Sequence, residues 1–139
     1  MIKEPLIFSN KMADLYFNAS TKKMVVIYHG LVDYDLLLEI IDSVNQIATE
    51  TGIYGTLVDI SELRGSFHRL LGYMEETGFP LLVEQGLKFQ AQIISDDLMM
   101  QNLSKKIEKL LTSLGVNLKT FTNRAEGEEW LNYQLARKG

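Results

Sequence analysis

Residues 55–67 of this chain read GTLVDISELRGSF and decide how the rest of the sequence is interpreted. The apolar run over residues 55–60 predicts a short central strand that carries Asp59 and is followed by Ser61. A glycine and then Ser66 open a helical pattern. A strand that brings polar side chains to a helix start is where open α/β sheets usually bind ligands. The stretch therefore predicts both the fold class and the edge of the sheet to examine.

The segments before this stretch predict a hairpin followed by a helix. Residues 13–18 and 23–30 are rich in aromatic and β-branched residues, and turn-like residues separate them. Asp33 or Asp35 could accept hydrogen bonds from free amides at the start of the helix, whose apolar residues recur at helical spacing until Gly52.

The segments after it predict alternating helices and strands. We expect Ser66 to cap a helix that runs to about Thr77 and ends at Gly78 and Pro80, with Pro80 opening another short helical segment. The remaining predictions are a half-buried strand with Leu87, Phe89, Ala91 and Ile93, a helix from Asp96 or Asp97 to Gly115, a strand over residues 118–122, and a helix from Asn123 anchored by Trp130, Leu131 and Leu135.

These elements follow the order ββαβαβαβα, which predicts an α/β fold with one mixed sheet. Right-handed crossovers make the later strands parallel, and the first hairpin adds an antiparallel edge. We assign residues 1–139 to a single domain, with residues 1–12 as an N-terminal extension.

Composition and charge narrow the classes of function. The 139 residues include 46% hydrophobic residues, as in an ordinary globular protein, and carry a net charge of −4, which argues against nonspecific nucleic-acid binding. We expect the basic pairs Lys22-Lys23 and Lys105-Lys106 to lie on solvated faces. The absence of cysteine excludes disulfides and Cys-ligated zinc, and no apolar run is long enough for a signal peptide or membrane span. A cytoplasmic protein that is not embedded in a membrane is expected.

Polar side chains that follow the predicted strands allow two interpretations. A parallel sheet would gather them at one edge, where oxygens and helix-start amides could bind a hard cation or a phosphoryl group. The simpler interpretation is that they cap helices and turns. The residues concerned are Asp59, Ser61, Ser66, Ser95, Asp96, Asp97 and Asn123.

The other ionisable residues predict no catalytic set. His29 and His68 lie near no serine or carboxylate arrangement that would mark a base and its nucleophile, and two histidines make a poor zinc site. The acidic pairs Glu75-Glu76 and Glu128-Glu129 are expected on solvated helix faces. We predict no metal site and no cofactor.

The second helix is soft and apolar. Its methionine and aromatic residues could line a lipid-like pocket or a partner groove, because methionine adapts to irregular surfaces. The simpler alternative is that these side chains complete the core. They are Phe67, Leu70, Leu71, Tyr73, Met74 and Phe79, together with Met99 and Met100 farther along the chain.

Three segments together resemble the SpoIIAA-like branch of the STAS superfamily. They are LVDISELRG after the third predicted strand, LKFQAQIISDD before the long helix, and FTNRAEGEEWL at the end, where Gly127 precedes the Trp130-Leu131 pair by three residues. The resemblance covers roughly residues 13–131. It implies a four- or five-stranded mixed sheet with helices mainly on one face, no intrinsic catalysis, and a role in partner binding or small-ligand sensing.

The same resemblance places a phosphorylatable serine at the start of the helix after the third strand. Ser66 occupies that position here. RGSF lacks both the aspartate directly before the serine and the glycine directly after it.

Our leading hypothesis is a non-enzymatic regulatory or protein-interaction domain. Its expected binding residues are Asp59, Ser61, Ser66, Phe67, Arg69, Leu70 and Met74. The alternative is a carrier or sensor of an apolar small molecule or lipid held between the second helix and the sheet, and the third is a metal- or phosphate-dependent enzyme using Asp59 and Asp96. An exposed apolar helix face could equally form a homodimer interface.

Overall fold

Six strands form one mixed sheet in the order β1-β2-β3-β4-β5-β6 in this computed structural model, which describes residues 2–65 and 68–137. Strands β1 to β3 are antiparallel neighbours, and β3 to β6 are parallel. The strands are β1 (Leu6–Ser9), β2 (Ala13–Asn18), β3 (Lys23–Leu31), β4 (Gly55–Arg64), β5 (Phe89–Ile93) and β6 (Asn117–Phe121). The helical elements are α1 (Tyr34–Thr51), α2 (His68–Tyr73), the π-helical turn η1 (Met74–Gly78), α3 (Phe79–Glu84), α4 (Leu98–Ser113) and α5 (Arg124–Ala136).

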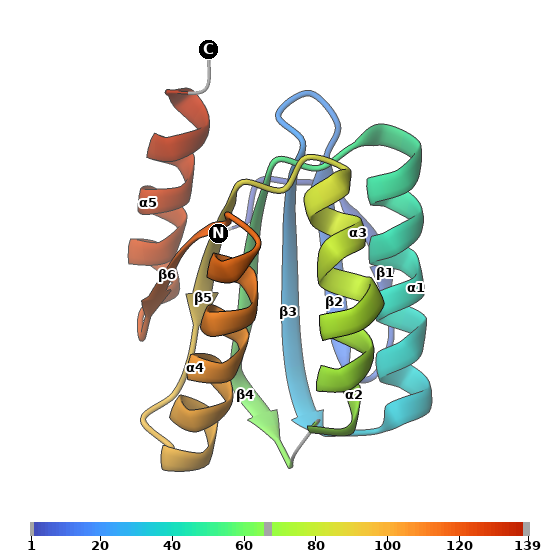
Figure 1. Cartoon of the computed structure of the whole chain (residues 1–139), viewed down its shortest axis with the longest axis vertical. Helices are drawn as coiled ribbons and strands as arrows, with labels where there is room; N and C mark the ends of the chain where they lie inside the picture. Colours follow the sequence, from blue (N-terminus) through green and yellow to red (C-terminus); the bar gives the residue numbers. More distant parts are fainter. Residues whose placement is uncertain (1, 66–67, 138–139) are drawn as a thin grey trace.

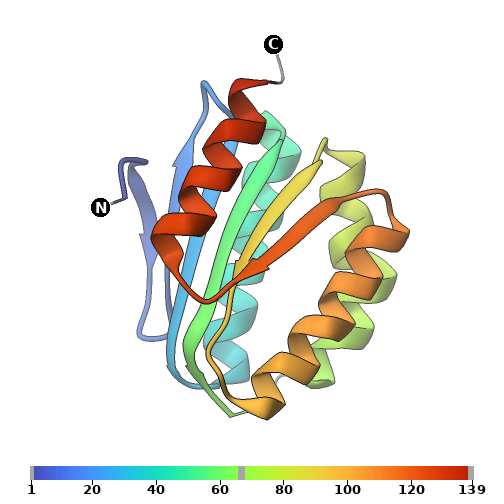
Figure 2. The same ribbon diagram turned by 90° about the vertical axis from the view of Figure 1, so that its left-hand side faces the viewer.

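The helices lie on the two faces of the sheet unequally. Helices α1 to α4 cover one face, and α5 covers the other together with Ile2 and Glu4 of the N-terminal segment (Figures 1 and 2). The larger core lies between the sheet and α1 to α4, and a smaller core forms where Leu131 of α5 packs on Leu57 and Ala91. Strands β4 and β5 are therefore covered on both faces, as central parallel strands usually are.

The N-terminal segment contributes an additional strand. Residues 1–12 were predicted to be an extension, but Leu6–Ser9 pairs with β2 as the edge strand β1. The predicted hairpin is present as β2 and β3. Strand β4 continues to Arg64, beyond the predicted end at residue 60, because β3 continues beside it to Leu31.

A bulge interrupts β4 at the stretch that first suggested a ligand edge. Ile27 of β3 pairs with Asp59, but His29 pairs with Glu62, so β4 holds one extra residue. Side chains alternate between the faces of a strand, and an extra residue reverses the alternation beyond it. Leu63 consequently lines the same hollow as Ile60.

The helical region after β4 differs from the prediction. We expected the helix to end at Gly78 and Pro80, but helical structure continues through η1 into α3. Proline lacks an N–H and its ring crowds the preceding turn. The chain accommodates Pro80 with a π-helical turn, in which the Phe79 N–H donates to the Met74 carbonyl five residues earlier. The predicted cap Ser66 lies outside the described residues.

Strand β5 was predicted to be half-buried, and this prediction is wrong. Gln90 and Gln92, which alternate with its apolar residues, are 4% and 0% exposed. The helix layer covers their face of the strand, and α5 covers the face that carries Ala91 and Ile93.

The helix starts agree with the sequence more closely. Asp33, Asp97 and Asn123 each accept a backbone N–H at the first turn of α1, α4 and α5. Such caps satisfy amides that have no partner within the helix. None of the helices in the described part of the chain is long and apolar enough to cross a membrane.

A buried ion pair joins β3 to α5 and the N-terminal segment. Lys23 was predicted to be solvated, yet it is 2% exposed. Its Nζ contacts Glu128 Oε2 at 2.6 Å, Glu4 Oε2 at 3.2 Å and Asn132 Oδ1 at 2.9 Å. Glu128 was also predicted to be solvated. It reaches Lys23 because α5 packs against the face of the sheet to which the Lys23 side chain points.

Candidate ligand-binding cavity

An apolar cavity of about 110 Å³ lies between the sheet and helices α1 to α4. Its walls come from almost every element on that side of the molecule. The lining residues are Met24, Val26 and Tyr28 of β3, Leu37, Ile41, Val44 and Asn45 of α1, Thr56, Val58, Ile60 and Leu63 of β4, Leu70 and Leu71 of α2, Met74 of η1, Phe79 and Leu82 of α3, Gln90 and Gln92 of β5, and Ile107 of α4.

The chemistry of the lining favours an uncharged apolar occupant. None of the described residues that line the cavity is aspartate, glutamate, lysine, arginine or histidine. Burying an isolated charge in such surroundings is expensive, whereas apolar surface gains free energy on leaving water. An apolar cavity of roughly 150 Å³ is known to hold benzene, so this one is close to the size of a single ring.

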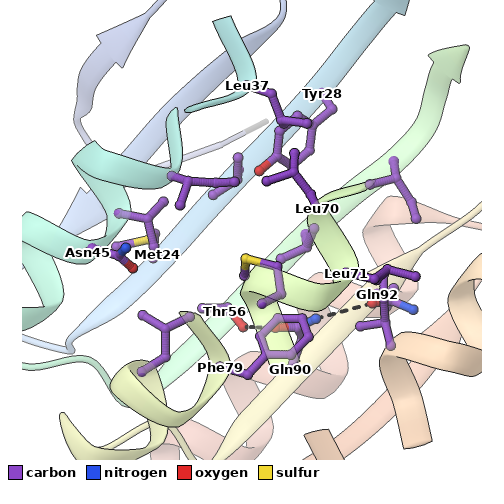
Figure 3. A pocket seen from close by; sticks show the side chains of 18 of the residues that line it. Met24, Tyr28, Leu37, Asn45, Thr56, Leu70, Leu71, Phe79, Gln90 and Gln92 are labelled. Atoms are coloured by element: carbon purple, nitrogen blue, oxygen red, sulfur yellow. Dashed lines mark hydrogen bonds between the residues drawn. The ribbon is translucent and has the colours of Figure 1, made fainter. Parts of the chain in front are cut away.

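Three of the five polar side chains among the described lining residues lie at one end of the cavity. Figure 3 shows Tyr28 beside Leu37 and Leu70 at the opposite end from the polar chain of Thr56, Gln90 and Gln92. The molecule thus combines a large apolar wall with a few fixed hydrogen-bonding groups, which is the usual composition of a small-ligand site.

The polar end is a directional hydrogen-bond chain. Thr56 Oγ1 donates to Gln90 Oε1 at 2.8 Å, and Gln90 Nε2 donates to Gln92 Oε1 at 3.2 Å. Gln92 Nε2 continues the chain to Ser104 Oγ of α4 at 2.7 Å. These hydrogen bonds offset the cost of burying two carboxamides and fix their orientation.

Tyr28 contributes a neutral phenol at the other end. Burial raises the pKa of the Tyr28 hydroxyl from its ordinary value of 10.0, because the ionised form loses its hydration. Tyr28 therefore adds no charge to the cavity at neutral pH.

A hydrogen bond between α1 and α2 and the π-helical turn η1 lie beside the cavity. Asn45 Nδ2 of α1 donates to the Tyr73 hydroxyl of α2 at 3.1 Å. Met74, in the π-helical turn, lines the cavity, and its sulfur occupies the space where a Cβ on Gly78 would lie. π-Helical turns are frequent at functional sites.

Two of the predicted binding residues line the cavity, and the other described ones lie elsewhere. Leu70 and Met74 line the cavity. Arg69 lies over the Tyr34 ring with its guanidinium carbon 4.5 Å from the ring centroid. Phe67 and Ser66 lie outside the described residues.

Asp59 and Ser61 do not reach this cavity. Thr56 and Val58 face α1 to α4, so Asp59, at an odd position before the bulge, faces the α5 side. Its Oδ1 accepts the Ser61 N–H at 2.9 Å and the Ser61 hydroxyl at 2.6 Å, and its Oδ2 accepts from Arg124 Nε at 2.8 Å. The carboxylate therefore stabilises the bulge and the start of α5.

Ser95 and Asp97 line one hollow with Ser61 at the predicted edge, and the polar residues there also make local hydrogen bonds. Asp97 and Asn123 are helix caps. The Ser95 hydroxyl accepts the Asp97 N–H at 3.4 Å. Among residues 2–65 and 68–137, no three histidine, aspartate or glutamate side chains are grouped as a metal site would require.

The sequence interpretation missed the polar end of the cavity, which is formed by Thr56, Gln90 and Gln92. The available signal was the pair of glutamines inside an apolar strand of a parallel sheet. A central parallel strand is covered on both faces, so both glutamines should have been expected inside the protein.

Comparisons with protein-family models, curated proteins and solved structures give no match to this chain. The cavity and its lining residues are therefore the basis for a functional proposal.

Proposed function

We propose that this protein is a non-enzymatic binding protein for a small, uncharged, mainly apolar molecule, which it carries or senses. The observation that carries the proposal is the cavity in the position where the sequence suggested a ligand, between the second helix and the sheet. The resemblance to SpoIIAA-like STAS proteins remains a prediction consistent with this function. The cavity's volume favours a single-ring compound over a long-chain lipid.

Toluene is a suitable first probe, because it is apolar and close to the cavity in size. A ligand that binds only the folded state stabilises that state by about 1.4 kcal/mol when its free concentration is ten times its Kd. For a chain of this length we expect Tm to rise by roughly 3–6 °C. Differential scanning calorimetry with and without toluene measures the shift.

Two substitutions on α1 locate the binding site. Val44→Phe adds volume to the cavity lining and is expected to abolish the toluene-induced rise in Tm. Leu38→Phe places the same side chain on the same helix at a position that is 44% exposed, and should leave the rise unchanged. No rise in the unsubstituted protein, or an equal rise in both variants, would contradict the proposed function.

A protein-interaction role is the second candidate, supported by apolar side chains beside the segment over residues 61–74. Leu31, at the end of β3, is 70% exposed, and Leu98 and Met99, at the start of α4, are 72% and 57% exposed. Single exposed apolar side chains are common, but a group at one edge is typical of a contact surface.

Affinity purification of the chain from its own cells tests this second candidate. Leu98→Glu should remove a specific partner, because it places a charge on the exposed apolar edge. Leu114→Glu at the opposite end of α4, where Leu114 is 37% exposed, should retain that partner. Equal recovery of every partner by the two variants would count against an interaction surface at this edge.

A further inference from the structure

The polar end of the cavity has hydrogen-bonding capacity that residues 2–65 and 68–137 do not use. A carboxamide nitrogen carries two N–H donors, and Gln90 Nε2 donates to Gln92 Oε1. Thr56 Oγ1 donates its proton to Gln90 Oε1 and keeps lone pairs that can accept. Both residues line the cavity, and Gln90 is 4% exposed. One donor and one acceptor are therefore available beside each other at this end.

A hydroxyl group matches this pair of groups. A hydroxyl oxygen can accept from Gln90 Nε2 while its proton is donated to Thr56 Oγ1. A carbonyl could use only the Gln90 donor, and a methyl group could use neither. A carboxylate or ammonium group would bring a charge into a cavity whose described lining holds no opposite charge.

We propose that the cavity selects a small phenol or alcohol whose hydroxyl is bound by Gln90 and Thr56 and whose hydrocarbon part packs on the apolar walls. This inference rests on the proposed function, because it names the chemical class of the same ligand. Selectivity arises because Thr56 and Gln92 hold the Gln90 carboxamide in place, and Ser104 holds Gln92, before the ligand arrives.

Phenol, toluene and benzoate provide the test, because they share one ring and differ in the group that would meet Gln90. In a cavity without polar partners, the buried hydroxyl would make phenol bind at least about tenfold more weakly than toluene. We expect titration calorimetry at pH 7 to show phenol binding at least as tightly as toluene, and no binding of benzoate. Tighter binding of toluene than phenol would overturn the inference and leave the proposed function standing, whereas absence of binding by both would overturn the proposed function.

Substitutions identify which side chains of the cavity bind the hydroxyl group of the ligand. Gln90→Met keeps a side chain of similar length without the amide, and should lower the affinity for phenol about tenfold relative to toluene. Thr56→Val removes the acceptor with little change in shape. It should also lower the affinity for phenol relative to toluene, and it serves as the test if Gln90→Met does not fold. Tyr28→Phe removes the other hydroxyl among the described lining residues and should leave the ratio of the two affinities unchanged. A ratio that changes in Tyr28→Phe, or that stays the same in both Gln90→Met and Thr56→Val, would overturn the inference.

Discussion

Replacing Lys23 with methionine is expected to lower the free energy of unfolding by about 3 kcal/mol. The Lys23 side chain is 3% exposed, donates to Glu128 and Asn132, and forms a second ion pair with Glu4 Oε2 at 3.2 Å. Methionine would fill much of the same space but leave two carboxylates facing each other without a cation. Their partial exposure, 11% for Glu4 and 20% for Glu128, places the expected loss at the lower end of the range for buried pairs.

Urea unfolding followed by circular dichroism measures this loss. Lys22→Met is the matched control, since Lys22 is the neighbouring lysine and is exposed. It should change stability by less than about 0.5 kcal/mol. Adding Glu128→Gln to Lys23→Met should recover part of the loss by removing one of the unpaired charges. Equal midpoints for the Lys22 and Lys23 variants would contradict the buried ion pair.

Replacing Gly86 with alanine is expected to cost about 3 kcal/mol, because backbone strain and a steric clash occur together. Gly86 has φ +115° at the end of α3, where its N–H donates to the Val83 carbonyl and the Leu87 N–H donates to the Leu82 carbonyl. A Cβ at Gly86 would lie 2.7 Å from the Ile53 carbonyl oxygen. This oxygen belongs to the backbone that leads into β4, so it cannot move aside as the end of a side chain could.

A substitution at Gly115 separates the cost of backbone strain from the cost of the steric clash. Gly115 ends α4 in the same hydrogen-bonding pattern, with φ +92°, but a Cβ there would meet nothing within 4 Å. Gly115→Ala therefore introduces strain alone and should cost about 1 kcal/mol. Thermal unfolding of both variants measures the difference, and a loss no larger for Gly86→Ala than for Gly115→Ala would contradict the close approach to Ile53.

Features set by neighbouring residues could be predicted from the sequence. Asp33, Asp97 and Asn123 cap helices because a short polar side chain there reaches amides two or three residues ahead. The α/β class and the parallel order of the later strands followed from the same local patterns. Leu70 and Met74 could be assigned to the cavity wall because helical spacing placed them on the face toward the sheet.

Features set by distant segments could not be predicted in this way. Lys23 is buried because Glu4 and Glu128, at opposite ends of the chain, meet it in space. The alternation in β5 predicted one solvated face, and only the place of the strand between β4 and β6 indicates that the face with Gln90 and Gln92 is covered as well. The cavity itself depends on how closely the side chains of the sheet pack against those of α1 to α4, and no sequence pattern specifies that.

Intermolecular nuclear Overhauser effects between toluene and assigned methyl groups show directly where an apolar molecule resides in the protein. We expect effects to Ile60, Leu70 and Met74, which line the cavity. We expect none to Leu57 and Leu131, which belong to the core on the α5 side of the sheet. Toluene that contacts only the α5 side, or that contacts no buried methyl group at saturating concentration, would contradict the assignment of this cavity as a ligand-binding site.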